Sequence, residues 1–172
     1  MPARPESVEL SPEHLEIWAS VATLLERLPA ALDAQLQRDS GLTHFEHGLL
    51  YALDRAPDRR LRMSTLAGYA SSTLSRLSRA ASRLEAKRLL RREPDPSDGR
   101  FTLAVLTPEG HAMVEEATPR HHALVDRLVF GALTEAQAHQ LGVVSRRIGE
   151  AIDAAPAWRP PEATTPENAS RP

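Results

Sequence analysis

The stretch LAGYASSTLSRLSRAASRLEAKRLLRREPDPSDGRFTLAVLTPEG, residues 66–110, decides the fold of this chain. Helical spacing predicts a short helix over Thr65–Ala70 and a second helix over Thr73–Arg88, the arrangement of a helix-turn-helix. Two short strands are predicted next, over Leu90–Glu93 and Phe101–Leu106, because Pro, Asp, Ser and Gly dominate the segment between them and favour a turn. The stretch therefore predicts a helix-turn-helix followed by a β-hairpin.

Positive charge is concentrated in this part of the chain. From Arg59 to Arg100 there are eleven Lys and Arg against four Asp and Glu, whereas the rest of the chain has ten basic and nineteen acidic residues. The formal net charge of −2 hides this division. A mildly acidic protein with one basic segment has a polarised surface, and the natural partner of that segment is a polyanion.

The predicted second helix has two different faces when its residues are placed about 100° apart. One face carries hydroxyl and guanidinium groups, namely Ser72, Ser75, Arg76, Arg79 and Arg83. The opposite face is mostly apolar and comprises Leu74, Leu77, Ala81, Leu84 and Arg88. Arginine contacts guanine or phosphate and serine contacts backbone or bases, so the polar face suits a DNA groove. An ordinary solvated arginine face is the alternative interpretation.

The predicted hairpin favours the DNA interpretation. Arg91 and Arg92 on its first strand and Arg100 after the turn form a basic projection beside the helix. A helix in the major groove and a basic hairpin over the adjacent minor groove make one coherent binding surface. Asp95 and Asp98 would repel phosphate, so we expect one of them to pair with an arginine and orient it.

The composition is that of a globular protein. The chain has 172 residues, of which 41% are hydrophobic and 26% charged, and the simplest organisation is one domain with its own core. The sequence has no cysteine, which excludes disulfides, thiolate zinc sites and cysteine-based redox sensing. The N-terminus does not resemble a signal peptide, and no apolar run is long enough to span a bilayer. We expect a cytoplasmic protein without a membrane partner.

Helices are predicted on both sides of the central stretch. The first begins at Ser11-Pro12, is kinked or divided at Pro29 and ends at Gly41. A second covers Thr43 to about Ala56. After the hairpin, one helix is predicted from Thr107 to about Leu133 and a last one from Thr134 to Ile152.

The outer helices carry more apolar surface than a small helix-turn-helix module can cover. The apolar positions are Leu15 to Leu28 at helical spacing, with Leu124, Leu128, Leu141, Val144, Ile148 and Ile152. A second copy of the chain would bury them, so we expect a homodimer with interleaved terminal helices. A self-contained monomeric helical layer is the alternative. Residues 1–10 are predicted to form a flexible leader and the proline-rich residues 154–172 a disordered tail.

Several motifs, taken in order, resemble the MarR family of winged-helix transcriptional regulators. They are Leu66-Ala67, Thr73-Leu74-Ser75-Arg76-Leu77, Arg83-Leu84-Glu85, Leu89-Leu90-Arg91-Arg92, Asp95-Pro96-Ser97-Asp98-Gly99-Arg100 and Leu106-Thr107-Pro108-Glu109-Gly110. The likeness extends over about residues 13–153 and keeps its order and spacing from the second helix through the hairpin. It is specific far beyond a lone motif.

The resemblance implies a mainly α fold with a small β-hairpin wing, in which a winged helix-turn-helix is flanked by N- and C-terminal dimerisation helices. A single domain would cover residues 11–153, with 43–107 as the winged helix-turn-helix and with 11–40 and 108–153 as the dimerisation helices. It further implies a homodimer on a pseudo-palindromic operator in double-stranded DNA. Many such proteins repress their own or neighbouring genes and release DNA when a small-molecule effector binds.

The DNA-binding residues predicted on this basis come from the second helix, the strand after it and the wing tip. They are Ser72, Thr73, Ser75, Arg76, Arg79, Arg83, Arg92, Asp98 and Arg100. The resemblance implies that Arg100 is the wing-tip arginine and Asp98 its partner. Leu74 and Arg76 depart from the family pattern, because a polar residue is frequent at the first position and a small one at the second. Because of this departure, the operator sequence of this protein is difficult to infer from the operators of other family members.

The resemblance also implies an effector pocket between the dimerisation helices and the winged module. Amphipathic side chains on the helices that would line it are Trp18, His44, His47, Tyr51 and His111. Each of them is equally compatible with core or interface packing.

Other functions have less support in the sequence. His44 and His47 share a helical face, but no complete set of metal ligands is visible, so neither a metal nor a cofactor is predicted. No nucleophile elbow, phosphate-binding glycine loop or paired-carboxylate motif is present, and we do not expect an enzyme. A winged-helix dimer that acts through a protein partner is the alternative to DNA binding, although charge is depleted at the core of protein interfaces.

Overall fold

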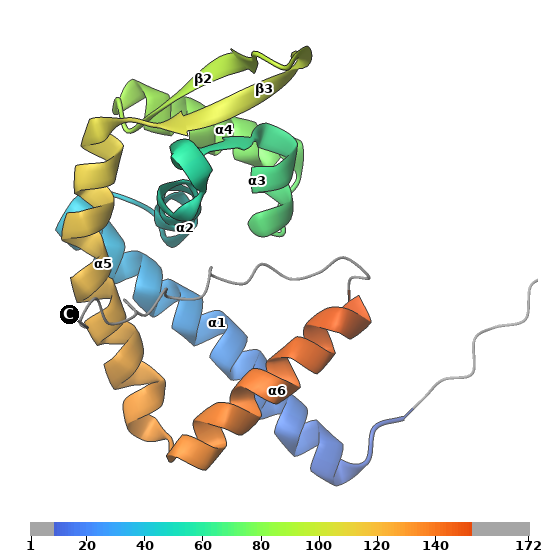
Figure 1. Cartoon of the computed structure of the whole chain (residues 1–172). Helices are drawn as coiled ribbons and strands as arrows, with labels where there is room; N and C mark the ends of the chain where they lie inside the picture. Colours follow the sequence, from blue (N-terminus) through green and yellow to red (C-terminus); the bar gives the residue numbers. More distant parts are fainter. Residues whose placement is uncertain (1–8, 153–172) are drawn as a thin grey trace, which may run out of the picture.

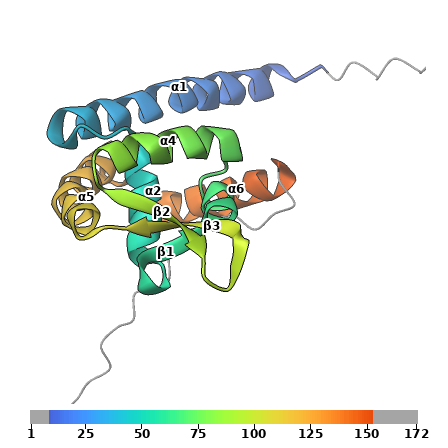
Figure 2. The same cartoon turned by 90° about the horizontal axis from the view of Figure 1, so that it is seen from above.

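The computed structural model describes residues 9–152, and it is mainly helical with one small antiparallel sheet (Figures 1 and 2). The prediction of fold class is thereby confirmed. The predicted tail at 154–172 and most of the predicted leader lie outside the described residues. The elements are α1 (Pro12–Ser40), α2 (His44–Arg55), the 3₁₀ turn η1 (Pro57–Arg59), β1 (Arg60–Arg62), α3 (Met63–Tyr69), α4 (Leu74–Ala86), β2 (Leu90–Asp95), β3 (Asp98–Leu106), α5 (Pro108–Leu128), the 3₁₀ turn η2 (Phe130–Ala132) and α6 (Glu135–Ile152).

Helix α1 is one uninterrupted helix, so Pro29 does not divide it, which was one of the two predicted effects of this residue. Ser11 caps its N-terminus by accepting a hydrogen bond from the backbone N–H of His14, and Gly41 ends it in the left-handed conformation. Pro29 removes one donor from the helix, which leaves the Leu25 carbonyl without its usual partner. Both Leu25 and Pro29 are exposed, so water can hydrate that carbonyl and the helix continues.

The helix-turn-helix consists of α3 and α4, which are packed on α2. A core of apolar side chains joins the three helices to the sheet, and Leu50, Leu53, Leu66, Leu77 and Leu84 are fully buried in it. Helix α4 ends at Ala86, two residues earlier than predicted, because Arg88 adopts a left-handed backbone and turns the chain into β2. The predicted helix over Thr107 to Leu133 likewise ends earlier, at Leu128.

The sheet has three strands in the order β1-β3-β2, all antiparallel. Strands β2 and β3 are the predicted hairpin. No strand was predicted before the helix-turn-helix, whereas Arg60–Arg62 form strand β1 and pair with Leu103–Val105. The wing is therefore anchored to the chain segment that precedes the helix-turn-helix, and not only to the hairpin itself.

Gly110 shows how closely α5 approaches the end of α4. A Cβ atom at this position would overlap the Leu89 carbonyl oxygen, which lies directly after the α4 turn. Thr107 caps α5, and its hydroxyl also donates a hydrogen bond of 2.7 Å to the Arg88 carbonyl. The wing, α4 and α5 are thus fixed to one another at this junction.

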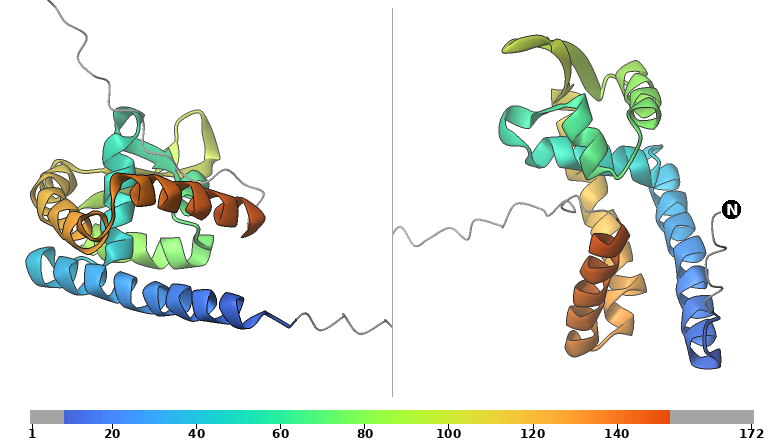
Figure 3. Two further views of the ribbon diagram at one scale, coloured as in Figure 1. Left: turned by 90° about the horizontal axis from the view of Figure 1, so that it is seen from below. Right: turned by 90° about the vertical axis from the view of Figure 1, so that its right-hand side faces the viewer.

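Helices α1, α5 and α6 extend away from the winged module and form an outer layer (Figures 1 and 3). Strands β2 and β3 and helix α4 lie at the end of the molecule opposite to α6 (Figure 1). Helix α6 crosses α1 in one view but stands apart from it in another, and it contains no buried residue (Figure 3). No helix in the described part of the chain is long and apolar enough to cross a membrane.

Candidate nucleic-acid interface

Helix α4 packs against β2 of the wing and has one polar and one buried face. Thr73 caps the helix, and its hydroxyl accepts a hydrogen bond from the backbone N–H of Arg76. The buried face consists of Leu77, Ala80, Ala81 and Leu84, all fully buried. Ser75, Arg76, Arg79 and Arg83 are exposed on the other face, as helical spacing predicted. Leu74 is 54% exposed, although helical spacing placed it on the apolar face.

Two arginines near the start of α4 are available to a ligand. The Arg76 guanidinium lies over the ring of Phe45, 4.4 Å from its centroid, and remains exposed. Arg79 is also exposed and has no hydrogen-bond or ion-pair partner among the residues that the structure describes. Both line a polar groove with Asp33, Thr43 and Arg83. An unpaired guanidinium on a helix surface can meet a phosphate or a base edge without breaking an existing contact.

Arg83 is held by the N-terminus of α2. Its Nε donates a 2.7 Å hydrogen bond to Oε1 of Glu46, while Oε2 of Glu46 accepts from the backbone N–H of Thr43 in a capping box. Burial of Glu46 raises its pKa, but the hydrogen bonds from Arg83 and Thr43 outweigh burial, and the net shift is downward. Arg83 is therefore a link between α4 and α2 that still exposes 56% of its side chain.

The Arg92 guanidinium is bound to side chains of α4. Its Nε and Nη2 bind the Glu85 carboxylate, and its other contacts are the hydroxyls of Ser78 and Ser82. The hydrogen bond from Arg92 lowers the pKa of Glu85. Arg92 thus clamps the wing to the recognition helix, a placement that the sequence pattern did not indicate. Its predicted role as a DNA contact stays a prediction.

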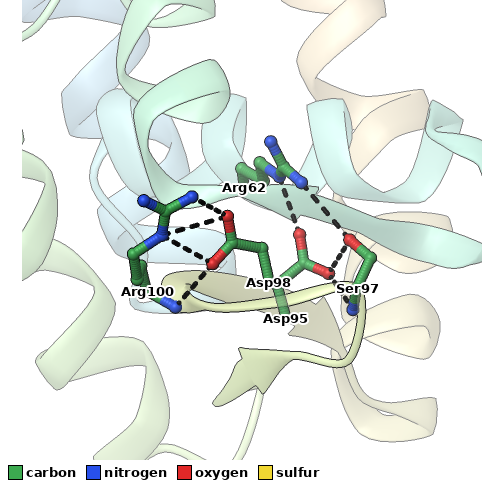
Figure 4. Close-up of polar contacts among 5 residues, drawn as sticks. All are labelled: Arg62, Asp95, Ser97, Asp98 and Arg100. Atoms are coloured by element: carbon green, nitrogen blue, oxygen red, sulfur yellow. Dashed lines mark hydrogen bonds and ion pairs between the residues drawn. The ribbon is translucent and has the colours of Figure 1, made fainter.

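Both aspartates of the wing turn are paired with arginines, where the sequence predicted one such pair (Figure 4). Asp98 binds Arg100 through two parallel hydrogen bonds, of 2.9 Å at Nε and 2.6 Å at Nη2. This pairing lowers the pKa of Asp98 and raises that of Arg100. Arg100 nevertheless exposes 85% of its side chain. The carboxylate therefore fixes the direction of the guanidinium without covering it.

The second pair involves Arg62, which the sequence analysis did not single out. Its Nε donates a 2.7 Å hydrogen bond to Asp95, and its guanidinium lies 4.3 Å from the centroid of the Phe101 ring. Hydrogen bonds from the Ser97 hydroxyl and backbone N–H, with that from Arg62, lower the pKa of Asp95 to about 2. Arg62 fastens the wing turn to β1 (Figure 4). Its position in the basic run Arg59–Arg62 was the available signal.

A separate cavity of about 350 Å³ lies between α2 and α3. Two of the predicted effector residues, His44 and Tyr51, line it together with Phe45, Leu66 and Tyr69. Most of the lining is apolar, which suits a small organic molecule better than an ion. Among the described residues, no group of three His, Asp or Glu side chains could hold a metal ion.

His47, a third predicted effector residue, does not line this cavity and is buried in a cluster of histidines. Its ring centroid lies 4.9 Å from that of His121, and the His121 ring lies 5.2 Å from that of His44. Burial, with the charges of His121, His44 and His122, lowers the pKa of His47 to about 4. The cluster therefore lies at the junction of α2 with α5. Its member His47 is uncharged at neutral pH.

The last two predicted effector residues lie elsewhere. His111 contacts side chains of two other elements, with Nδ1 2.7 Å from Asp54 on α2 and Nε2 3.0 Å from the Arg59 guanidinium on η1. Trp18 is on the outer half of α1 and is 55% exposed. One chain alone does not bring Trp18 or His111 to the cavity lining.

The described geometry defines a winged helix-turn-helix protein with a basic face formed by α4 and the wing tip. A profile of the MarR family matches residues 40–100. No curated protein matches the sequence. Among solved structures, Sco3205, a MarR family transcriptional regulator from Streptomyces coelicolor in complex with DNA, is 42% identical, with a TM-score of 0.83 over 84% of this chain and 94% of that one.

A second regulator of that organism, AbsC, is 30% identical, with a TM-score of 0.83 over 87% of this chain and all of that one. BpsR of Bordetella bronchiseptica, whose DNA binding is regulated by 6-hydroxynicotinic acid, shares the fold at 24% identity and a TM-score of 0.69, over 86% of this chain and 99% of that one. The chain belongs to the MarR family. It is accordingly a DNA-binding transcriptional regulator and not an enzyme.

Proposed function

We propose that this chain is a homodimeric repressor that binds a pseudo-palindromic operator in its own or a neighbouring promoter and leaves it when a small molecule binds. The observation that carries the proposal is the exposed serine and arginine face of α4, placed beside a wing whose tip arginine is held outward by Asp98. In this proposal residues 43–107 bind DNA, and residues 11–40 and 108–153 join two copies within the single domain 11–153.

In the proposed complex α4 enters the major groove, and Ser72, Ser75, Arg76 and Arg79 face base edges and phosphates. Small hydroxyl residues let the helix approach the groove closely enough for the arginines to reach the bases. The wing then follows the adjacent minor groove, where Arg100 meets the negative potential. The relative Sco3205, solved in complex with DNA, supports DNA as the partner of this face. Arg83 and Arg92 contribute mainly by holding α4 to α2 and to the wing.

The homodimer is supported by the apolar side chains of the outer layer. Trp18, Leu25 and Ile148 are each more than half exposed in the single chain, and they lie on the helices expected to interleave. Burial of such side chains against a second copy removes apolar area from water, at about 25 cal/mol per Å². A two-fold dimer would also present two copies of α4 to the two halves of an operator.

The effector is proposed to occupy the cavity between α2 and α3. His44 and Tyr51 would supply polar contacts there, within a mostly apolar lining. BpsR, a protein of the same fold, gives an example of regulation by a small aromatic acid. Trp18 and His111 would take part only if a second copy or a movement of α1 brings them near.

Fluorescence anisotropy of the full-length protein on its own upstream DNA tests the proposal, with a scrambled duplex of equal length as control. At physiological salt we expect the native duplex to bind at least about 1,000-fold more tightly. The affinity should also fall steeply as salt is raised, because phosphate contacts release counterions. Equal affinity for both duplexes would indicate either that the operator lies elsewhere or that the protein binds DNA without sequence preference. No binding to either duplex would favour the alternative, in which the dimer acts through a protein partner.

A further inference from the structure

Leu74 is the one large apolar side chain of α4 that the fold does not bury. Leu77, Ala80, Ala81 and Leu84 of this helix are completely buried and the small Ala86 at its C-terminus is exposed, whereas Leu74 exposes 54% of its surface. It is the first residue of the helix and directly follows the capping residue Thr73. Packing inside the chain therefore gives no reason for a leucine at this position.

The position of Leu74 is one from which a recognition helix reads DNA. In helix-turn-helix proteins the N-terminal residues of the second helix contact base edges in the major groove. The neighbours of Leu74, from Ser72 to Arg76, are otherwise hydroxyl residues and an arginine.

The base edges offer Leu74 only one apolar group. In the major groove, guanine, cytosine and adenine present hydrogen-bonding atoms, and thymine adds its C5-methyl group. A leucine pressed against the polar edges would displace their water without supplying a hydrogen bond, which costs free energy. Contact with a thymine methyl instead removes apolar surface of both partners from water.

We propose that Leu74 is a specificity-determining residue that selects a thymine in each operator half-site by contact with its C5-methyl group. The inference rests on the proposed function, because it requires α4 to lie in the major groove. It also explains why a leucine can stand where polar residues are frequent in the family. The polar face of α4 supplies affinity and hydrogen bonds. Leu74 distinguishes thymine from the other bases through the C5-methyl group.

The test uses a duplex selected from a random pool with the full-length protein. Each thymine of that duplex is replaced singly by uracil, which lacks only the C5-methyl group. The dissociation constants of the wild type and of Leu74→Ala are then measured by anisotropy. At one thymine of each half-site, uracil should weaken wild-type binding about fourfold, the effect of one buried methyl group, and should leave Leu74→Ala unaffected.

The control variant is Leu10→Ala, which removes another exposed leucine, outside the helices, and should keep the wild-type response to uracil. The inference is overturned if uracil has no effect at any thymine, or weakens the wild type and Leu74→Ala equally. Sequence-selective binding with either of these results would leave the proposed function intact. Failure of any duplex to be enriched would overturn the proposed function and the inference together.

Discussion

The winged module and the outer helices differ in how completely one chain buries their apolar side chains and pairs their charges. In the module, Leu66, Leu77 and Leu84 are fully buried, and the carboxylates of Glu46, Glu85, Asp95 and Asp98 each bind an arginine. In the outer layer, α6 contains no buried residue and Trp18 and Ile148 are more than half exposed. The apolar side chains of the module are largely buried within one chain, whereas the outer layer leaves large apolar side chains exposed, which the proposed second copy would cover.

The same contrast exists among the arginines of the module. Arg92 is engaged by Glu85, Ser78 and Ser82, and Arg79 has no partner in the described part of the chain. Arg92 holds the wing to α4, whereas Arg79 can meet DNA without breaking an existing contact. Position on a basic segment therefore does not by itself determine the role of an arginine, and neither does pairing, because Arg100 is bound to Asp98 and still exposes 85% of its side chain.

The largest expected effect is on the outer layer. Ile148→Asp should raise the dissociation constant of the homodimer about 100-fold or more, because an unpaired carboxylate would be buried in the interface. Sedimentation velocity at a series of concentrations measures this shift. Gln140→Asp adds the same charge at an exposed position earlier on the same helix and should leave the dimer intact. A dimer equally stable in both variants would place the interface away from Ile148.

The next effect concerns the free arginine. Arg79→Ala should lower operator affinity by about 1–3 kcal/mol and relax base preference, because a bidentate contact to a base edge is lost. Anisotropy on the operator and on random DNA measures both changes, with Arg127→Ala on α5 as the control. Equal losses on the two DNAs would instead assign Arg79 to a phosphate.

The engaged arginine should behave differently. Arg92→Ala should reduce the free energy of unfolding by about 1–2 kcal/mol, because Glu85 and two serine hydroxyls lose their donor. Urea denaturation of Arg92→Ala, Glu85→Ala and the double variant gives the coupling energy between the two side chains. Additive effects of the two substitutions would contradict the clamp.

The smallest effect is a pH dependence at the junction of the two regions. The pKa of His47 is about 4 in the folded protein, below its ordinary value of 6.5, so the folded state favours the neutral ring. Its contribution to stability is complete above about pH 6.5 and is lost as the pH falls from there toward 4. Between pH 7.5 and 5.5 this group should lower the melting temperature by about 3 °C.

His47→Gln should remove that part of the pH dependence, whereas the exposed His139→Gln should keep it. Melting curves at fixed protein concentration make the comparison. The same decrease in all three proteins would mean that His47 does not titrate as its burial requires.

The sequence predicted those features whose causes are local. Ser11, Thr43, Thr73 and Thr107 each begin a helix by capping, and a capping signal lies within four residues of chain. The hairpin was also found, because its turn residues lie between two short apolar runs. The arginine face of α4 followed from helical spacing alone.

Features that depend on distant contacts were missed or misassigned. Strand β1 is only three residues long and exists because Arg60–Arg62 pair with β3, forty residues later in the chain. The contact between Arg92 and Glu85 was missed, because a sequence does not reveal that α4 places Glu85 beside β2; the predicted DNA contact of Arg92 stays a prediction. Helical spacing placed Leu74 on the buried face, but the first residue of α4 that the core buries is Leu77, one turn later.

The mass of the protein–operator complex tests the central claim most directly. Light scattering on the complex eluting from a sizing column should give one duplex with two chains of 18.9 kDa each. Ile148→Asp should reduce the amount of this species without producing a stable complex of one chain per operator. A single wild-type chain bound per operator, with full affinity and specificity, would contradict the account in which the winged module reads DNA and the outer helices supply the second copy.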